Sequence, residues 1–175
     1  LEYMPAPDFS TGGEIIYRRE EMERIVNTGT GSFQIRSRWR YLPDERIIEV
    51  YEIPYTTKTD VIIERIVKLS KEGKVREIAD IRDETDLSGL RIAIDLKRGV
   101  DPEQLMAKLF RSTTLQDSFA CNFNVLVDGY PRVMGVREIL REWVAWRVES
   151  TRRRMNFDLA KKTDRLHLLH GLEAI

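Results

Sequence analysis

The sequence of 175 residues contains a single cysteine, Cys121, which excludes a disulfide within the chain. One thiol fits a reducing compartment, and we expect Cys121 to be a small buried hydrophobic side chain rather than a nucleophile. The sequence also lacks a signal peptide, an initiator Met and any run of about 18 apolar residues that could span a membrane. These absences favour a cytoplasmic protein without a membrane partner. The chain reads as a piece of a longer protein, because it starts at Leu1-Glu2 and stops inside a helical pattern.

The chain lacks an excess of either charge, with 29 Lys and Arg against 29 Asp and Glu. The distribution is uneven, because residues 136–175 hold nine basic and six acidic side chains, a net charge of +3, which leaves −3 for residues 1–135. Neither part is basic enough to identify a nucleic-acid-binding protein by charge alone.

Proline is absent after residue 135, and glycine does not occur again until Gly171. Apolar residues recur there at steps of three and four: Ile139, Leu140, Trp143, Trp146, Met155, Leu159, Leu166 and Leu169. This pattern predicts one helix of roughly 60 Å at 1.5 Å per residue. A domain of this size cannot cover so long an element, so we expect a projecting arm or packing against further sequence. We therefore divide the chain into a domain at 1–135 and an arm helix at 136–175.

Residues 1–135 alternate between strand and helix patterns. Strands are expected at 14–17, 32–40, 46–53, 77–82, 90–96 and 119–127, and helices at 19–27, 59–73 and from 101 onward. Turns are expected at 42–45, 88–89 and 128–131. Strand 90–96 alternates apolar and polar residues, and Asp101-Pro102 is a strong helix start. Either Thr59 or Asp60 could cap the second helix. The order predicts an α+β fold, with helices packed on a largely antiparallel sheet and a long C-terminal helix.

Two groups of basic residues are candidates for DNA-backbone contact. Arg36, Arg38 and Arg40 form a row on one face of strand 32–40, and a second group lies on the long helix: Arg152, Arg153, Arg154, Lys161 and Lys162. Phosphate neutralisation needs cations on a rigid surface rather than any special spacing. The alternative for both groups is a solvated face held by local ion pairs.

Other constellations favour structural roles. Asp83, Glu84 and Asp86 could hold a hard cation, but neighbouring Arg82 and Arg91 favour a charged turn. His167 and His170 lack a third ligand, and Trp143 and Trp146 share a helix face typical of packing. We predict no metal site and no catalytic site in this chain.

The chain resembles the A subunit of bacterial type IIA DNA topoisomerases, gyrase and topoisomerase IV, over essentially all of its length. Seven segments in order carry the resemblance: Met4-Pro5-Ala6-Pro7-Asp8-Phe9-Ser10-Thr11-Gly12-Gly13, Thr28-Gly29-Thr30-Gly31-Ser32, Glu52-Ile53-Pro54-Tyr55, residues 82–99, Leu109-Phe110-Arg111-Ser112-Thr113-Thr114-Leu115-Gln116, Asn122-Phe123-Asn124, and Arg152-Arg153-Arg154 with Arg165-Leu166-His167-Leu168-Leu169. Gyrase and topoisomerase IV stay open as alternatives, and so do supercoiling and decatenation.

The resemblance implies a tower domain followed by the start of a coiled-coil arm. It also implies that the catalytic tyrosine lies upstream of this chain, so that Arg40-Tyr41 is only a superficial copy of that site. ATP and Mg²⁺ would be held by the B subunit, and this piece would need no cofactor. The implied partners are double-stranded DNA, a second A subunit and the B subunit. The function expected is to contact and position the gate duplex during ATP-dependent strand passage; the alternative is a protein-interaction spacer that never meets DNA.

Overall fold

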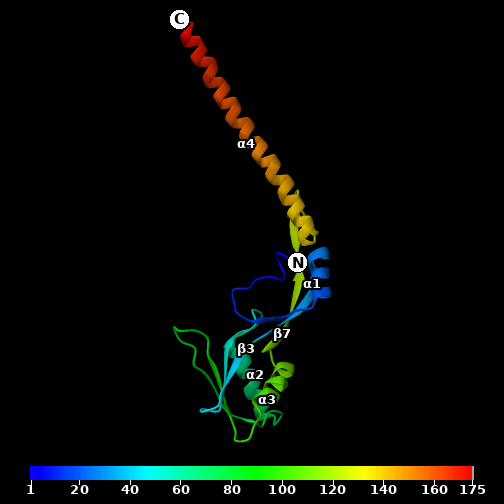
Figure 1. Ribbon diagram of the computed structural model, residues 1–175, viewed down its shortest axis with the longest axis vertical. Helices are drawn as coiled ribbons and strands as arrows, with labels where there is room; N and C mark the ends of the chain where they lie inside the picture. Colours follow the sequence, from blue (N-terminus) through cyan, green and yellow to red (C-terminus); the bar gives the residue numbers. More distant parts are fainter. Residues whose placement is uncertain (175) are drawn as a thin grey trace. The chain divides into compact units, whose positions relative to one another are not determined.

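The computed structural model describes residues 1–174, which form two compact units. One unit contains Leu1–Ile25 and Thr30–Cys121, and the other contains Val26–Gly29 and the chain from Asn122 onward. The described residues form four helices and nine strands whose registered pairings are antiparallel (Figure 1). The predicted α+β class is confirmed, whereas the boundary at 135/136 stays a prediction.

A small sheet in the first unit has the strand order β1-β2-β7, formed by Glu14–Ile16, Thr30–Arg36 and Gln116–Asn122. Helix α1, Arg19–Thr28, buries Met22 and Ile25. Phe33 is buried on β2, with its ring centroid 5.5 Å from that of Phe119. Cys121 is a buried free cysteine, as predicted, and burial raises the pKa of its thiol.

The larger sheet has the order β3-β4-β6-β5, formed by Arg38–Leu42, Ile47–Glu52, Ile92–Leu96 and Ile78–Asp83. Helices α2, Thr59–Lys71, and α3, Pro102–Ser112, lie side by side and contribute to the same hydrophobic core as this sheet (Figure 1). The core includes Ile48 and Ile94 from the strands and Ile66 and Leu109 from the helices, all fully buried. This packing leaves the other face of the sheet for charged side chains.

The predicted strand at 32–40 is wrong, because the structure breaks it at Ser37 into β2 and β3, which belong to different sheets. The Ser37 amide donates to the carbonyl of Leu115 over 2.8 Å instead of pairing within a ladder. A register shift between Arg38 and Trp39 then reorients β3 against β4. Arg36 is thereby separated from the other two arginines of the predicted row.

The predicted strand at 119–127 is also broken, because β7 ends at Asn122 and β8 spans Asn124–Val127. The Phe123 amide donates to the Gly29 carbonyl over 2.8 Å, and the Phe123 carbonyl accepts from the Met134 amide at 3.1 Å. The turn predicted at 128–131 contains only Asp128-Gly129, with φ of 51° and 83° as a two-residue hairpin requires. Tyr130–Val133 forms β9, paired with β8.

Of the two predicted helix caps, that of α3 is confirmed and that of α2 is not. The Asp101 side chain accepts from the amides of Glu103 and Gln104, as expected for the cap of α3. The predicted cap of α2 is wrong, because Thr59 and Asp60 lie inside the helix and Lys58 occupies the cap position without a side-chain hydrogen bond. The remaining predicted elements are present, with ends shifted by one or two residues.

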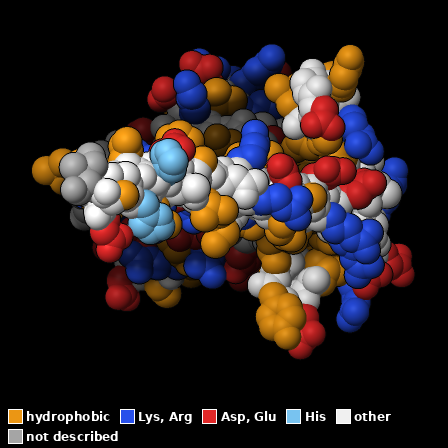
Figure 2. Space-filling view, turned by 90° about the horizontal axis from the view of Figure 1, so that it is seen from above, with side chains coloured by type: hydrophobic (Ala, Val, Ile, Leu, Met, Phe, Trp, Pro, Cys, Tyr) orange, Lys and Arg blue, Asp and Glu red, His pale blue; other side chains and the backbone are white. Residues whose placement is uncertain are grey.

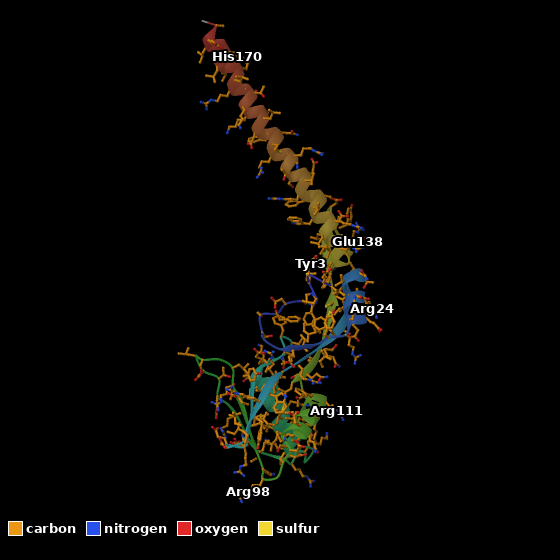
Figure 3. All side chains as sticks on the ribbon, in the orientation of Figure 1. Tyr3, Arg24, Arg98, Arg111, Glu138 and His170 are labelled. Atoms are coloured by element: carbon orange, nitrogen blue, oxygen red, sulfur yellow. The ribbon has the colours of Figure 1, made fainter. Side chains whose placement is uncertain are left out.

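Helix α4, Val136–Glu173, is the predicted long helix and has no buried residue. Figure 3 shows its side chains radiating on all sides between Glu138 and His170. Residues 1–174 contain no helix that is long and apolar enough to cross a membrane.

Candidate nucleic-acid interface

The basic group on α4 stands on a helix that positions its side chains at fixed intervals. Arg152 pairs with Glu149 over 3.2 Å, and Arg153 donates to the Ser150 hydroxyl over 3.3 Å. Within residues 1–174, no ion pair involves Arg154, Lys161 or Lys162, which are exposed. These three cations are therefore available to an anionic partner.

A row of cations on the same helix, which includes two members of this group, was not predicted from the sequence. Arg147, Arg154 and Lys161 are seven residues apart, which places them on one face of a helix at intervals of about 10 Å. Arg165 follows Lys161 by four residues on the same face. The acidic residue Asp158 lies beside the row, four residues after Arg154 and three before Lys161. The seven-residue spacing was the signal that could have revealed the row.

The arginines predicted to line one strand each have partners in the structure. The Arg36 guanidinium lies 4.6 Å from the Phe110 ring centroid and donates to Gln116 over 2.8 Å. Arg38 lies 3.5 Å from both Glu14 and Glu52. These contacts hold the two guanidinium groups in place but also neutralise Arg38.

Arg40 lies on the outer face of β3, where it is hydrogen-bonded to Glu49 of β4. Glu49 is only 5% exposed and also lies 3.3 Å from Arg91. The hydrogen bond from Arg40 holds the pKa of Glu49 below its ordinary value, against the opposing effect of burial. Tyr41, the other half of the superficial arginine–tyrosine pair, packs against the hydrophobic core.

The ion pairs continue across the outer face of the larger sheet. Arg91 lies 3.2 Å from Glu84, which in turn accepts from Arg82 at 3.0 Å. Arg82 also pairs with Asp95 and Asp80. Three arginines and four carboxylates make up the connected network, Arg40, Arg82 and Arg91 with Glu49, Glu84, Asp80 and Asp95, while Arg38 pairs separately with Glu14 and Glu52. This face is therefore close to neutral, and it attracts a polyanion weakly.

The acidic turn at 83–86 is occupied by local hydrogen bonds. Asp83 accepts from the Thr85 amide at 3.0 Å, and Asp86 accepts from the Ser88 amide at 2.8 Å. Hydrogen bonds from the side chains of Thr85 and Ser88, together with those from their amides, lower the pKa of the Asp83 and Asp86 carboxyl groups. Within residues 1–174, no group of three or more His, Cys, Asp or Glu is arranged to hold a metal ion.

Surface charge is mixed beyond this sheet. Figure 2 shows basic and acidic side chains interspersed over the face that it presents. The structure thus brings Arg38 and Arg40 together, separates Arg36 from them, and leaves part of the α4 group without protein partners.

Known proteins are similar to this chain over nearly all of its length. The sequence model of a family described as the A subunit of DNA gyrase/topoisomerase IV matches residues 1–175. The chain is 41% identical over 175 residues to the DNA gyrase A subunit of Ureaplasma parvum, covering 98% of this chain and 21% of that protein. It is 39% identical over 177 residues to the probable chloroplastic/mitochondrial DNA gyrase A subunit of Oryza sativa, covering 98% and 19%. The chain thus spans about a fifth of the length of these relatives.

Proposed function

Because the chain belongs to the family of DNA gyrase/topoisomerase IV A subunits, we propose that it forms a tower region and the start of a coiled-coil arm, which contact and position a DNA duplex. In the complete enzyme this role supports ATP-dependent double-strand passage, with the nucleophilic tyrosine on another part of the A chain. The proposed partners are double-stranded DNA, a second A subunit and the B subunit, in the cytoplasm. ATP and Mg²⁺ are assigned to the B subunit.

The unpaired cations on α4 carry the proposal. Arg154, Lys161 and Lys162 are exposed on a regular helix, so phosphate contact costs no existing ion pair. Each phosphate neutralised by such a cation releases counterions, which makes affinity fall with salt. Arg36 is a further candidate, because Phe110 and Gln116 orient its guanidinium without neutralising its charge.

A second function, that of a spacer without DNA contact, is favoured by the ion pairs of the larger sheet. Arg38 and Arg40 already have carboxylate partners, and a DNA phosphate would have to displace them. Under this alternative the exposed cations of α4 keep the arm soluble and never meet DNA.

A salt titration of duplex binding separates the two functions. We would measure the affinity of the intact A subunit, reconstituted with its B subunit, for a linear duplex between 50 and 300 mM salt. The test variant changes Arg154, Lys161 and Lys162 to Gln; the matched control changes Arg137 and Arg141, basic residues near the start of the same helix, to Gln. Arg36→Gln with Arg38→Gln tests the arginines of the two sheets, one on β2 and one on β3, and leaves Arg40 to pair with Glu49.

We expect the test variant to bind more weakly and to lower the slope of log affinity against log salt by about 0.9 for each phosphate that is no longer neutralised. The control should keep the slope of the unaltered enzyme. A slope unchanged in both the α4 and the sheet variants would contradict the DNA-contact role and leave the spacer function.

A further inference from the structure

Helix α4 begins in backbone contact with the last turn of α1, within the compact unit that contains Val26–Gly29 and the chain from Asn122 onward. A Cβ added to Gly135, the N-cap of α4, would lie 2.2 Å from the carbonyl oxygen of Asn27 and 2.6 Å from that of Val26. Gly135 is buried, and its φ of −70° suits any residue. The close approach of two backbones, and not a special backbone conformation, is therefore what excludes a side chain at this position.

A second glycine makes the same kind of contact from the other side. Gly29 is buried directly after α1, and a Cβ there would lie 2.2 Å from the carbonyl oxygen of Met134. Phe123 binds both segments, because its amide donates to the Gly29 carbonyl over 2.8 Å and its carbonyl accepts from the Met134 amide at 3.1 Å. Backbone atoms have no rotamers to change, so a joint made of them leaves little freedom for rearrangement.

The ends of the two helices also carry complementary partial charges. The carbonyl groups of Val26 and Asn27 belong to the last turn of α1, which is the negative end of that helix dipole. Gly135 precedes the first amides of α4, which form the positive end of the second dipole. The contact of Gly135 with these carbonyls therefore brings opposite ends together, and α4 has no side-chain cap in their place.

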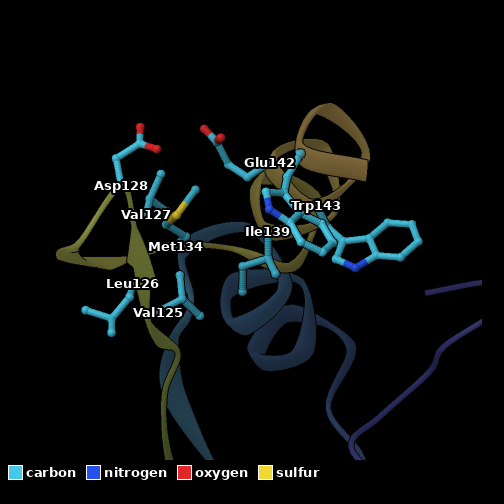
Figure 4. A pocket seen from close by; sticks show the side chains of 9 residues that line it. Val125, Leu126, Val127, Asp128, Met134, Ile139, Glu142 and Trp143 are labelled. Carbon is cyan, nitrogen blue, oxygen red and sulfur yellow. The ribbon is translucent and has the colours of Figure 1, made fainter. Parts of the chain in front are cut away.

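Side chains add little to the fixing of α4. Figure 4 shows Met134 and Ile139 near Val125 and Val127 of β8, and these four line an apolar hollow of about 350 Å³. A hollow of this size is not a close-packed contact. Met134 is 1% exposed, whereas Ile139 is half-buried and residues 140–149 of α4 are exposed. The backbone contact at the first turn is therefore what sets the direction of α4 within this unit.

We propose that the joint formed by Val26–Gly29, Phe123, Met134 and Gly135 makes α4 and the last turn of α1 one rigid lever. A change in the direction of α4 then carries the last turn of α1 with it, because no side chain at the joint can rotate to absorb the movement. The use of this lever rests on the proposed function, in which α4 starts an arm. The rigidity of the joint does not depend on DNA contact.

Two spin labels measure this rigidity on the intact A subunit without DNA. Cysteines that replace Asn27 and Asp158, both exposed, carry the labels in a subunit whose other accessible cysteines are removed. Position 158 lies about 35 Å along α4 from Gly135, so a small rotation at the joint gives a large displacement. Labelled subunits are mixed with an excess of unlabelled ones, and pulsed electron paramagnetic resonance then gives the distribution of distances within one copy.

The test variant, Gly135→Ala, adds one methyl group at an allowed φ. The matched control, Gly171→Ala, adds the same group on the same helix with nothing within 4 Å of it. We expect one narrow distribution for the unaltered subunit and for the control. Gly135→Ala should give a distribution at least about twice as wide, or a displaced maximum, because the methyl group forces the two backbones apart.

A broad distribution in the unaltered subunit would overturn the proposal, and that measurement does not depend on the folding of a variant. An unchanged distribution in Gly135→Ala would overturn it too, because it would show that the backbone contact does not set the direction of α4. Neither result bears on DNA contact, which the salt titration tests separately.

Discussion

Glu49 lies beneath two guanidinium groups on the outer face of the larger sheet. It is 5% exposed, hydrogen-bonded to Arg40 and 3.3 Å from Arg91. A buried carboxylate is tolerated only when it is paired, and removing one member leaves the others uncompensated. At the scale of single residues, this acid organises the charges that the sequence presents as a row of arginines.

Replacing Glu49 by Gln should destabilise the chain by about 2–4 kcal/mol, because Arg40 then loses its carboxylate partner and Arg91 keeps only Glu84. Chemical denaturation monitored by circular dichroism measures the change. Glu14→Gln is the control, since Glu14 is exposed and pairs with Arg38 at a longer 3.5 Å. A loss equal to that of the control would show that the triad contributes nothing to stability.

The same residue predicts the acid dependence of stability. The pKa of Glu49 in the folded chain is lowered chiefly by its hydrogen bond from Arg40. The contribution of Glu49 to folding stability is therefore fully present above its pKa in the unfolded chain, about 4.3. It is lost as the pH falls through the lowered pKa of Glu49 in the folded chain. Glu49→Gln should consequently show a shallower loss of stability below about pH 5 than the unaltered chain.

At the scale of elements, the junction that ends α1 depends on one glycine. Gly29 has φ +75°, and its carbonyl accepts the amide of Phe123. A Cβ at this position would lie 2.2 Å from the carbonyl oxygen of Met134. The hydrogen bond from the Phe123 amide to Gly29 also lies where the predicted strand at 119–127 is interrupted. The end of α1 and the break between β7 and β8 therefore meet at one backbone contact.

Gly29→Ala should therefore reduce the stability of the chain more than an alanine does at a positive-φ position with free space around it. The matched control is Gly129→Ala, which has a similar φ of +83° and nothing within 4 Å of the added Cβ. We expect the control to lose about 1–2 kcal/mol and Gly29→Ala at least about 2 kcal/mol more, by overpacking against backbone. Equal losses in thermal denaturation would show that the junction relaxes freely around the methyl group.

The sequence predicts helices and strands well where their pattern is local. It fails where a hydrogen bond to a backbone group distant in the sequence determines where a strand ends. The alternation at Ile92 and Ile94 and the cap at Asp101 are local features, and both are found. The breaks at Ser37 and Phe123 depend on hydrogen bonds to backbone groups that lie far away along the chain. No window of sequence contains such partners.

The candidate site shows the same limit. Sequence identifies every cation, but the carboxylates that neutralise Arg38 and Arg40 come from neighbouring strands whose register is a product of the fold. On α4 the local pattern suffices, because helical spacing alone sets which cations share a face.

At the scale of the whole molecule, the two compact units differ in what stabilises them. The first contains the large core shared by sheet and helices, whereas α4 in the second has no buried residue. Tertiary packing supplies most of the stability of helices in proteins, so in the 175-residue chain by itself α4 depends on its own helix propensity.

Hydrogen exchange of the 175-residue chain should reveal this difference. We expect amides of α4 to exchange at least about a hundredfold faster than those of β4 and β6, because opening α4 exposes little buried surface. Mass spectrometry of peptides from both units, at two protein concentrations, measures it. Protection of α4 equal to that of the core strands at both concentrations would contradict the expectation, and protection that rises with concentration would indicate self-association.

The contacts of Glu49 also constrain how sequences of this family can diverge. Loss of Glu49 removes the carboxylate partner of Arg40 and leaves Arg91 paired only with Glu84, whereas loss of both arginines leaves the Glu49 carboxylate buried in the sheet without a counter-charge. Single changes at positions 40, 49 and 91 therefore pass through poorly tolerated intermediates, and the three positions should be replaced together. Among homologues, these columns should covary, with an apolar residue at 49 wherever 40 and 91 have both lost their charge.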